Sequence, residues 1–145
     1  MTTWLNRRRA QEKHVATVFK RLSIDAPIDA VWEKIADLEG VHNLMSFLKD
    51  AKVEGDRRVC TIHDGAQLTE LILGVDPKNR RIAYSITDSP FGFEFHAASW
   101  QLRGDKDGTE LEWFTDVKPD AAAETVSQAI DGEAAHIVSA LAGQK

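Results

Sequence analysis

Five β-strands in unbroken succession are the strongest constraint that this sequence places on its fold. Short polar turns separate apolar, β-branched segments, which predicts strands near residues 57–63, 66–75, 81–87, 95–103 and 109–117. One long helix follows them, and no strand comes after it. A sheet of this length curls, and a closing helix then leaves a pocket between sheet and helix. The pattern therefore predicts a container for a small apolar molecule, and it does not specify which molecule.

The remaining predicted elements precede this succession of strands. Residues 14–24 alternate in polarity and are rich in β-branched side chains, which predicts a first strand. Pro27 favours the first turn of a helix that ends at Gly40, because a helix leaves the N–H that proline lacks unpaired there. A second short helix is predicted over 41–47. A strand over 48–54 follows, and its lysines favour a position at the edge of the sheet.

Local signals also define a hairpin and the ends of the final helix. The pair Asp64-Gly65 is typical of a two-residue hairpin turn. We expect Asp120 to cap the final helix and Gly143 to end it. Gly132 lies in the middle of this helix, where glycine costs about 1 kcal/mol relative to alanine. The apolar face of the helix contains several small residues, and we expect them to leave room beneath it. That face comprises Ala122, Val126, Ile130, Ala134, Ile137, Val138 and Leu141.

The composition is that of one globular domain with a charged amino-terminal segment. The chain has 145 residues, of which 43% are apolar and 28% are charged. We expect a loosely ordered basic arm over 1–14 and a single ligand-binding domain over 15–143. The net charge is −5, but residues 1–21 carry six cations against Glu12, so the remainder sums to −10. Because that acidic remainder would repel phosphate, we expect the arm to be a solvated segment rather than a nucleic-acid site.

Several classes of site and location are not expected. Cys60 is the only cysteine, so no disulfide forms within the chain, and its place in a predicted strand indicates a small buried hydrophobe. The five histidines lack metal-type spacing, and no glycine-rich phosphate loop or serine nucleophile elbow occurs. We therefore expect no metal and no cofactor. No apolar run approaches the ~20 residues that span a bilayer, and no secretory or twin-arginine signal is found. These features predict a cytoplasmic protein without stable membrane insertion.

Five segments in order resemble the polyketide cyclase/dehydrase and lipid transport family of the START-like superfamily. They are 26–32 (APIDAVW), 53–55 (VEG), 68–71 (LTEL), 75–76 with 82–86 (VD and IAYSI), and 108–113 (GTELEW). The resemblance covers roughly residues 15–142. It implies an α+β helix-grip fold like that of the birch pollen allergen, in which a curved antiparallel sheet encloses an apolar cavity around a long carboxy-terminal helix. The implied order is one strand, two helices, six strands and one helix.

The resemblance also implies a range of functions. Family members bind lipids, hormones or polyketides, and some catalyse cyclisation or dehydration. Two departures narrow that range. Residues 41–46 lack the Trp-x-Pro that many bacterial members carry. Residues 63–66 (HDGA) replace the gate loop of the plant hormone receptors, so signalling through that gate is not expected.

Alternation along the strands assigns polar residues to the inner face of the sheet. Tyr84, His96, Trp100 and Trp113 each share a face with apolar neighbours, so we expect them to point inward. Glu70 shares its face with leucine and isoleucine, and the resemblance also places this glutamate and His96 in the cavity. A one-residue slip in the hairpin would turn Glu70 outward.

A buried glutamate needs a partner, and two candidates follow from the sequence. An ionised carboxylate is unfavourable in an apolar pocket, and either His96 or Arg58 would compensate it. A pair of Glu70 and His96 could exchange a proton at neutral pH, as an aldol cyclisation or a dehydration requires. The same residues could instead hydrogen-bond a ligand or form a structural polar cluster.

The candidate ligand-binding residues come from the whole length of the predicted domain. Tyr84 and the tryptophans offer aromatic area with polar tips, suited to a flat or hydrophobic ligand. We expect Met45 and Phe47 at the mouth of the cavity, and Phe91 and Phe93 as a lid over it or as a dimer surface. The full set is Met45, Phe47, Arg58, Glu70, Tyr84, Phe91, Phe93, His96, Trp100, Trp113, Val126 and Ile130.

Three classes of function stay open on the sequence alone. The first is binding or transport of a small hydrophobic molecule, such as a lipid, a quinone or an aromatic polyketide. The second is a cyclase or dehydratase that uses Glu70 and His96 as acid and base. The third is a protein-interaction module that acts through the arm or through the loop of Phe91 and Phe93. The oligomeric state, a homodimer included, stays open as well.

Overall fold

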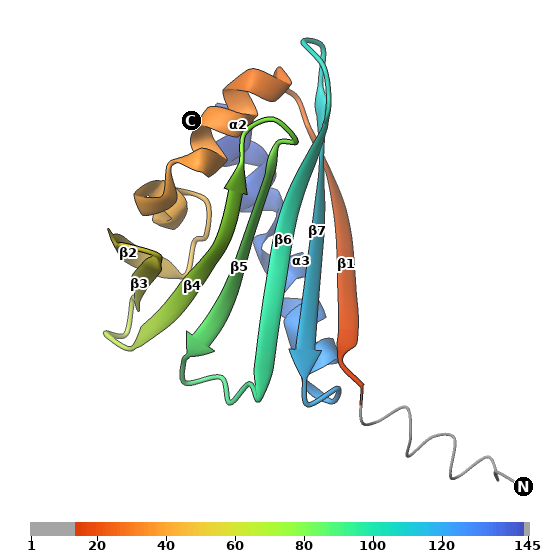
Figure 1. Ribbon diagram of the computed structural model, residues 1–145. Helices are drawn as coiled ribbons and strands as arrows, with labels where there is room; N and C mark the ends of the chain where they lie inside the picture. Colours follow the sequence, from red (N-terminus) through yellow and green to blue (C-terminus); the bar gives the residue numbers. More distant parts are fainter. Residues whose placement is uncertain (1–13, 144–145) are drawn as a thin grey trace, which may run out of the picture.

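The computed structural model describes residues 14–143 and shows one antiparallel sheet that curves around its helices (Figure 1). The predicted basic arm lies almost entirely outside the described residues. The elements in chain order are β1 (Ala16–Ile24), α2 (Ile28–Ala36), the 3₁₀ helix η1 (Leu38–Asn43), β2 (Leu48–Glu54), β3 (Arg57–Ile62), β4 (Gln67–Asp76), β5 (Arg81–Asp88), β6 (Phe95–Gly104), β7 (Thr109–Lys118) and α3 (Ala122–Leu141). The predicted α+β class and the predicted order of elements are confirmed.

The sheet has the strand order β1-β7-β6-β5-β4-β3-β2. Its last six strands are joined in sequence by turns, and β1 closes the other side by pairing with β7. The connection through α2 and η1 carries the chain from one edge strand to the other. β2 is an edge strand, as its lysines predicted, and Lys49 and Lys52 are both exposed.

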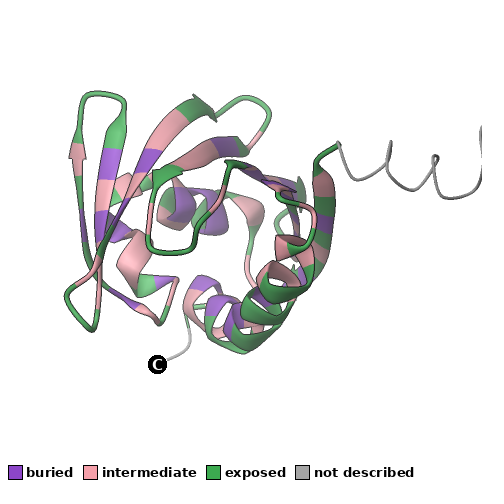
Figure 2. Cartoon of the chain, turned by 90° about the horizontal axis from the view of Figure 1, so that it is seen from below, coloured by how far each residue is buried: buried purple, intermediate pink, exposed green. Residues whose placement is uncertain are grey.

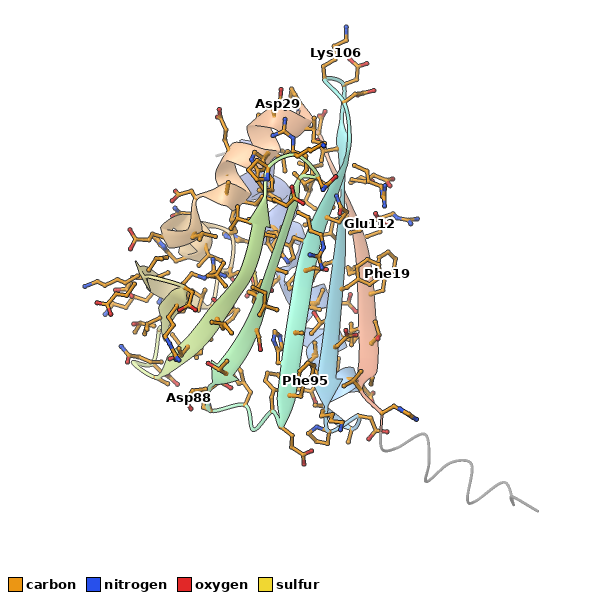
Figure 3. All side chains as sticks on the ribbon, viewed as in Figure 1. Phe19, Asp29, Asp88, Phe95, Lys106 and Glu112 are labelled. Atoms are coloured by element: carbon orange, nitrogen blue, oxygen red, sulfur yellow. The ribbon has the colours of Figure 1, made fainter. Side chains whose placement is uncertain are left out.

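The two faces of the sheet differ because side chains alternate along each strand. On β7, Leu111 and Trp113 are buried inside, and Phe114 faces outward with 41% exposure. Phe19, Phe95 and Glu112 also belong to the face turned away from α3, as Figure 3 shows. Figure 2 shows the buried positions as separate bands along the strands, which is the pattern of a sheet with one covered face.

The turn between β3 and β4 differs from the predicted two-residue hairpin. β3 ends at Ile62 and β4 begins at Gln67, so four residues connect them. Gly65 has a φ of 96°, whereas Asp64 has no positive φ. The Asp64 carboxylate instead accepts a hydrogen bond of 2.8 Å from the Ala66 N–H. Aspartate stabilises this wider turn through its side chain, a role that competes with the two-residue type.

The helices between β1 and β2 also differ in their bounds from the prediction. α2 ends at Ala36 rather than at Gly40, and Pro27 is its N-cap residue rather than part of its first turn. The second helix is the 3₁₀ helix η1 over Leu38–Asn43, not a helix over 41–47. Helix periodicity alone does not fix where a helix ends or whether a short helix is 3₁₀.

The final helix α3 packs mainly against β1 and β7. It begins at Ala122 without a side-chain cap, so Asp120 is not the cap that we expected. Its buried residues are Ile130, Glu133, Ile137 and Leu141. Glu133 is the member of this face that the apolar pattern did not include. Because the helix lies over one side of the sheet, space remains between its first half and the strands β3 to β6.

Candidate functional site

A cavity of about 840 Å³ occupies the space between the inner face of the sheet and α3. Its wall contains residues from β3 to β7, from the segment 41–48 and from the first half of α3. Phe91, in the β5–β6 loop, and Ala129, on α3, belong to its wall and are exposed. The cavity therefore reaches the surface between the β5–β6 loop and α3. In Figure 2, seen from below, the sheet and α3 surround this region.

All twelve residues that the sequence proposed for ligand binding belong to the wall of this cavity. They are Met45, Phe47, Arg58, Glu70, Tyr84, Phe91, Phe93, His96, Trp100, Trp113, Val126 and Ile130. For the residues on strands, the inward position follows from the alternation of apolar and polar side chains along each strand. The register pairs Arg58 with Glu70 across β3 and β4, so the slip that would have turned Glu70 outward is absent.

Arg58 is the partner of Glu70. The Arg58 Nε donates to Glu70 Oε1 at 2.7 Å, and the two side chains are only 5% and 7% exposed. Arg58 Nη1 also donates to the Leu38 carbonyl at 3.1 Å, which links the pair to η1. Burial alone would lower the pKa of Arg58, but the adjacent Glu70 carboxylate raises the net value. Arg58 therefore stays cationic, and the pair is charge-neutral.

Cys60 lies beside this ion pair. Its Sγ is 3.3 Å from Glu70 Oε1, and the residue is fully buried. Burial, reinforced by the Glu70 charge, raises the pKa of the Cys60 thiol to about 12. A thiol held in its protonated form is a poor nucleophile. The structure thus agrees with the small buried hydrophobe that the sequence predicted.

His96 is held as a neutral ring whose free nitrogen is a donor. The backbone N–H of Ile86 donates to His96 Nδ1 at 3.0 Å. Because that N–H can only donate, Nδ1 carries no proton, and the proton of the neutral ring is on Nε2. Burial lowers the pKa of His96 to about 4. The Ser85 hydroxyl donates to the His96 carbonyl and fixes the backbone here.

Glu70 and His96 do not form a hydrogen-bonded pair within residues 14–143. Glu70 is on β4 and His96 is on β6, with β5 between them. Strands two positions apart in a sheet are separated by ~10 Å, which is too far for direct contact between these groups. Tyr84 on β5 occupies the intervening position, with its ring centroid 5.9 Å from that of His96 and 5.6 Å from the Arg58 guanidinium carbon.

Trp100 and Trp113 form the floor below Tyr84. They are paired across β6 and β7, and their rings meet edge to face with centroids 5.1 Å apart. Burial raises the pKa of Tyr84, and the nearby indole N–H groups of both tryptophans, as potential donors to the phenolic oxygen, act in the opposite sense. Neither N–H reaches it with the geometry of a hydrogen bond, so both are buried donors without a partner.

A second carboxylate, Glu133 on α3, belongs to the same wall and was missed by the sequence analysis. It is 8% exposed and accepts hydrogen bonds from the Ser46 backbone N–H at 3.0 Å and from the Ser46 hydroxyl at 2.8 Å. His136 Nε2 lies 3.1 Å from the Asn43 carbonyl. These contacts attach the segment 43–46 to α3. Glu133 lies three residues after Ile130, and this helical spacing is the signal that could have identified it.

The β5–β6 loop borders the mouth of the cavity. Phe91 is 47% exposed, and its ring centroid lies 6.0 Å from that of Phe93. Phe93 in turn contacts His96, with centroids 5.3 Å apart. A row of aromatic rings thus leads from the exposed Phe91 through Phe93 to the buried His96. Whether it acts as a lid, as a dimer surface or as a docking site for a protein stays a prediction.

Residues 14–143 contain neither a cluster of metal ligands nor a membrane-spanning helix. No group of three or more histidine, cysteine, aspartate or glutamate side chains is placed to hold a metal ion there. No helix in this part of the chain is long and apolar enough to cross a membrane.

Solved structures share this architecture at low sequence identity. A protein from Bacillus thuringiensis is 18% identical, with a TM-score of 0.79 over 87% of this chain and 98% of that one. The Zhui aromatase/cyclase from Streptomyces sp. R1128 is 21% identical, with a TM-score of 0.70 over 90% and 93%. A START superfamily protein from Mycobacterium smegmatis is 14% identical, with a TM-score of 0.69 over 88% and 94%. These likenesses establish the helix-grip fold.

The sequence itself matches one family. A comparison with curated protein sequences finds no relative. The family described as polyketide cyclase/dehydrase and lipid transport matches residues 15–142, which is nearly the whole chain. The chain belongs to this polyketide cyclase/dehydrase and lipid transport family.

Proposed function

We propose that the protein binds a small hydrophobic molecule, such as a lipid, a quinone or an aromatic polyketide, in its internal cavity. The observation that carries this proposal is the cavity itself, whose volume of about 840 Å³ falls within the range of small-molecule sites. Its wall is mostly apolar, and its one buried ion pair is internally neutralised. Burial of an apolar ligand there would be favourable by about 25 cal/mol for each Å² of apolar surface removed from water.

A pair of matched variants on α3 tests this proposal. Ala129 belongs to the cavity wall, whereas Ala135 on the same helix is exposed and does not. We expect the wild-type protein to carry a co-purifying molecule in native mass spectrometry, and Ala129→Trp to lose it because the indole fills the cavity. Ala135→Trp adds the same side chain outside the cavity and should retain the molecule. A protein that is empty from several expression hosts would contradict the proposal.

The alternative is a cyclase or dehydratase that uses Glu70 and His96. His96 supports it as an electrophile, because a neutral ring with its proton on Nε2 can polarise a substrate carbonyl by donating a hydrogen bond to its oxygen. Glu70 supports it less, because its Oε1 is already engaged by Arg58. The molecule recovered from the protein separates the two functions. A carrier would return an added ligand unchanged, and a dehydratase would return it lighter by one water.

A further inference from the structure

Tyr84 offers the first hydrogen-bond donor of the cavity. Its side chain belongs to the cavity wall together with Trp100 and Trp113, and its hydroxyl makes no hydrogen bond within residues 14–143. Both tryptophans are more than nine-tenths buried, and neither N–H has a hydrogen-bond partner. A phenol carries one O–H donor, so Tyr84 can donate a hydrogen bond to a ligand in the cavity.

His96 offers a second donor beside the first. Its Nδ1 accepts from the Ile86 N–H, so the proton is on Nε2. Within residues 14–143, Nε2 makes no hydrogen bond of its own. The ring lies next to Tyr84, with centroids 5.9 Å apart, and it also belongs to the cavity wall. Two N–H or O–H donors thus lie side by side on β5 and β6.

The carboxylates of the cavity are already engaged as acceptors. Glu70 accepts from Arg58 and Cys60. Glu133 accepts from the backbone N–H and the hydroxyl of Ser46. The charge of Arg58 cancels that of Glu70, so Glu133 leaves the wall with one net negative charge. A ligand with an anionic group would therefore meet repulsion.

We propose that Tyr84 and His96 together bind an uncharged acceptor oxygen of the ligand, and that the ligand class is therefore a hydrophobic carbonyl compound such as a ketone or a quinone. This inference rests on the proposed function, since it specifies the ligand of the same cavity. A carbonyl oxygen has two lone pairs and can accept from both donors at once.

Two probes of the same shape test this inference. 2-Acetylnaphthalene carries a carbonyl, and 2-isopropenylnaphthalene replaces that oxygen with a methylene group. We expect the wild-type protein to bind the ketone roughly tenfold more tightly than the alkene in isothermal titration calorimetry, because each net hydrogen bond is worth about 1 kcal/mol. The anion 2-naphthoate should bind more weakly than the ketone.

Two variants then test whether the tighter binding of the ketone depends on the two donors, Tyr84 and His96. Tyr84→Phe removes the hydroxyl, and His96→Asn removes the Nε2 donor and keeps an amide oxygen that can accept from the Ile86 N–H. Each should weaken ketone binding roughly 3- to 10-fold. Alkene binding should change less than ketone binding, and circular dichroism with thermal unfolding shows that each variant is folded. The carbonyl stretch of bound, ¹³C-labelled ketone should lie at lower frequency in the wild type than in either variant.

The outcomes separate this inference from the proposed function. Equal binding of ketone and alkene to the wild type would overturn the inference and leave the cavity as a binding site for hydrophobic molecules. Tighter binding of 2-naphthoate than of the ketone would overturn it as well, as would ketone affinity and carbonyl frequency that neither variant changes. If neither neutral probe bound, the proposed function would fail together with the inference.

Discussion

The ion pair of Arg58 and Glu70 lies deep in the wall of a mostly apolar cavity, where each charge depends on the other. Alternation along the strand was sufficient to predict that Glu70 faces inward, because the period of a strand is two. Its partner could not be chosen from the sequence. That choice depends on register and on strand order, which place Arg58 directly opposite Glu70 and His96 two strands away.

Removal of one partner of this pair should be far more harmful than removal of both. Arg58→Met leaves the Glu70 carboxylate buried without its counter-charge, and we expect it to lower the free energy of unfolding by about 3–5 kcal/mol. The double variant Arg58→Met/Glu70→Leu should recover most of that loss. Urea denaturation measures both. A double variant that is no more stable than the single one would show that the pair is not coupled as described.

His96 should make stability depend on pH in a specific range. Its pKa is about 4 in the folded protein, against an ordinary value of 6.5. Above pH 6.5 both states are neutral. As the pH is lowered from 6.5 to 4, only the unfolded chain takes up the proton. The free energy of unfolding therefore decreases, and at pH 4 it is about 3 kcal/mol lower than above pH 6.5.

The control for this pH effect is His96→Asn, which cannot titrate. Carboxylates also titrate at acidic pH, but the variant and the wild type contain the same carboxylates, so their contribution cancels in a comparison of the two proteins. The informative quantity is therefore the difference between the two proteins in denaturant unfolding across this range. We expect the wild type to lose more stability than His96→Asn as the pH falls from 6.5 to 4. Parallel curves would exclude a strongly depressed pKa of His96.

At the scale of elements, the strands were predictable and the ends of the helices were not. Each strand from β3 to β7 is bounded by turn residues that act locally, so its limits were predicted to within about two residues. The interruption between α2 and η1 and the uncapped start of α3 depend on packing against other elements. Glu133 escaped notice because its hydrogen bonds to Ser46 join positions that are distant in sequence.

Gly132 offers a test of how α3 borders the cavity. A β-carbon at this position would have no atom within 4 Å, so Gly132→Ala introduces no clash. We expect Gly132→Ala to raise the free energy of unfolding by about 1 kcal/mol through helix propensity alone, and to leave ligand binding intact. Ala129→Gly, one turn earlier, should lower it by a similar amount. Urea denaturation measures both variants, and a loss of stability in Gly132→Ala would show that the space is not open.

At the scale of the whole molecule, the curved sheet and α3 form a container whose tryptophans report on its contents. Trp100 and Trp113 belong to the cavity wall, whereas Trp32 on α2 is buried elsewhere in the core. The Arg80 guanidinium lies over the Trp32 ring at 5.8 Å. The container was predictable from the order of elements. Its volume was not, because that depends on where α3 rests on the sheet.

The most direct test of the central claim is a titration with 2-isopropenylnaphthalene followed by ¹H–¹⁵N NMR. Each indole N–H gives its own signal, so the cavity and the remaining core are observed in one spectrum. We predict that the signals of Trp100 and Trp113 shift and saturate at one ligand per protein, while that of Trp32 stays in place. Shifts that do not saturate, or that occur at Trp32 and the outer residues Phe19 and Phe114 instead, would contradict a ligand-binding cavity.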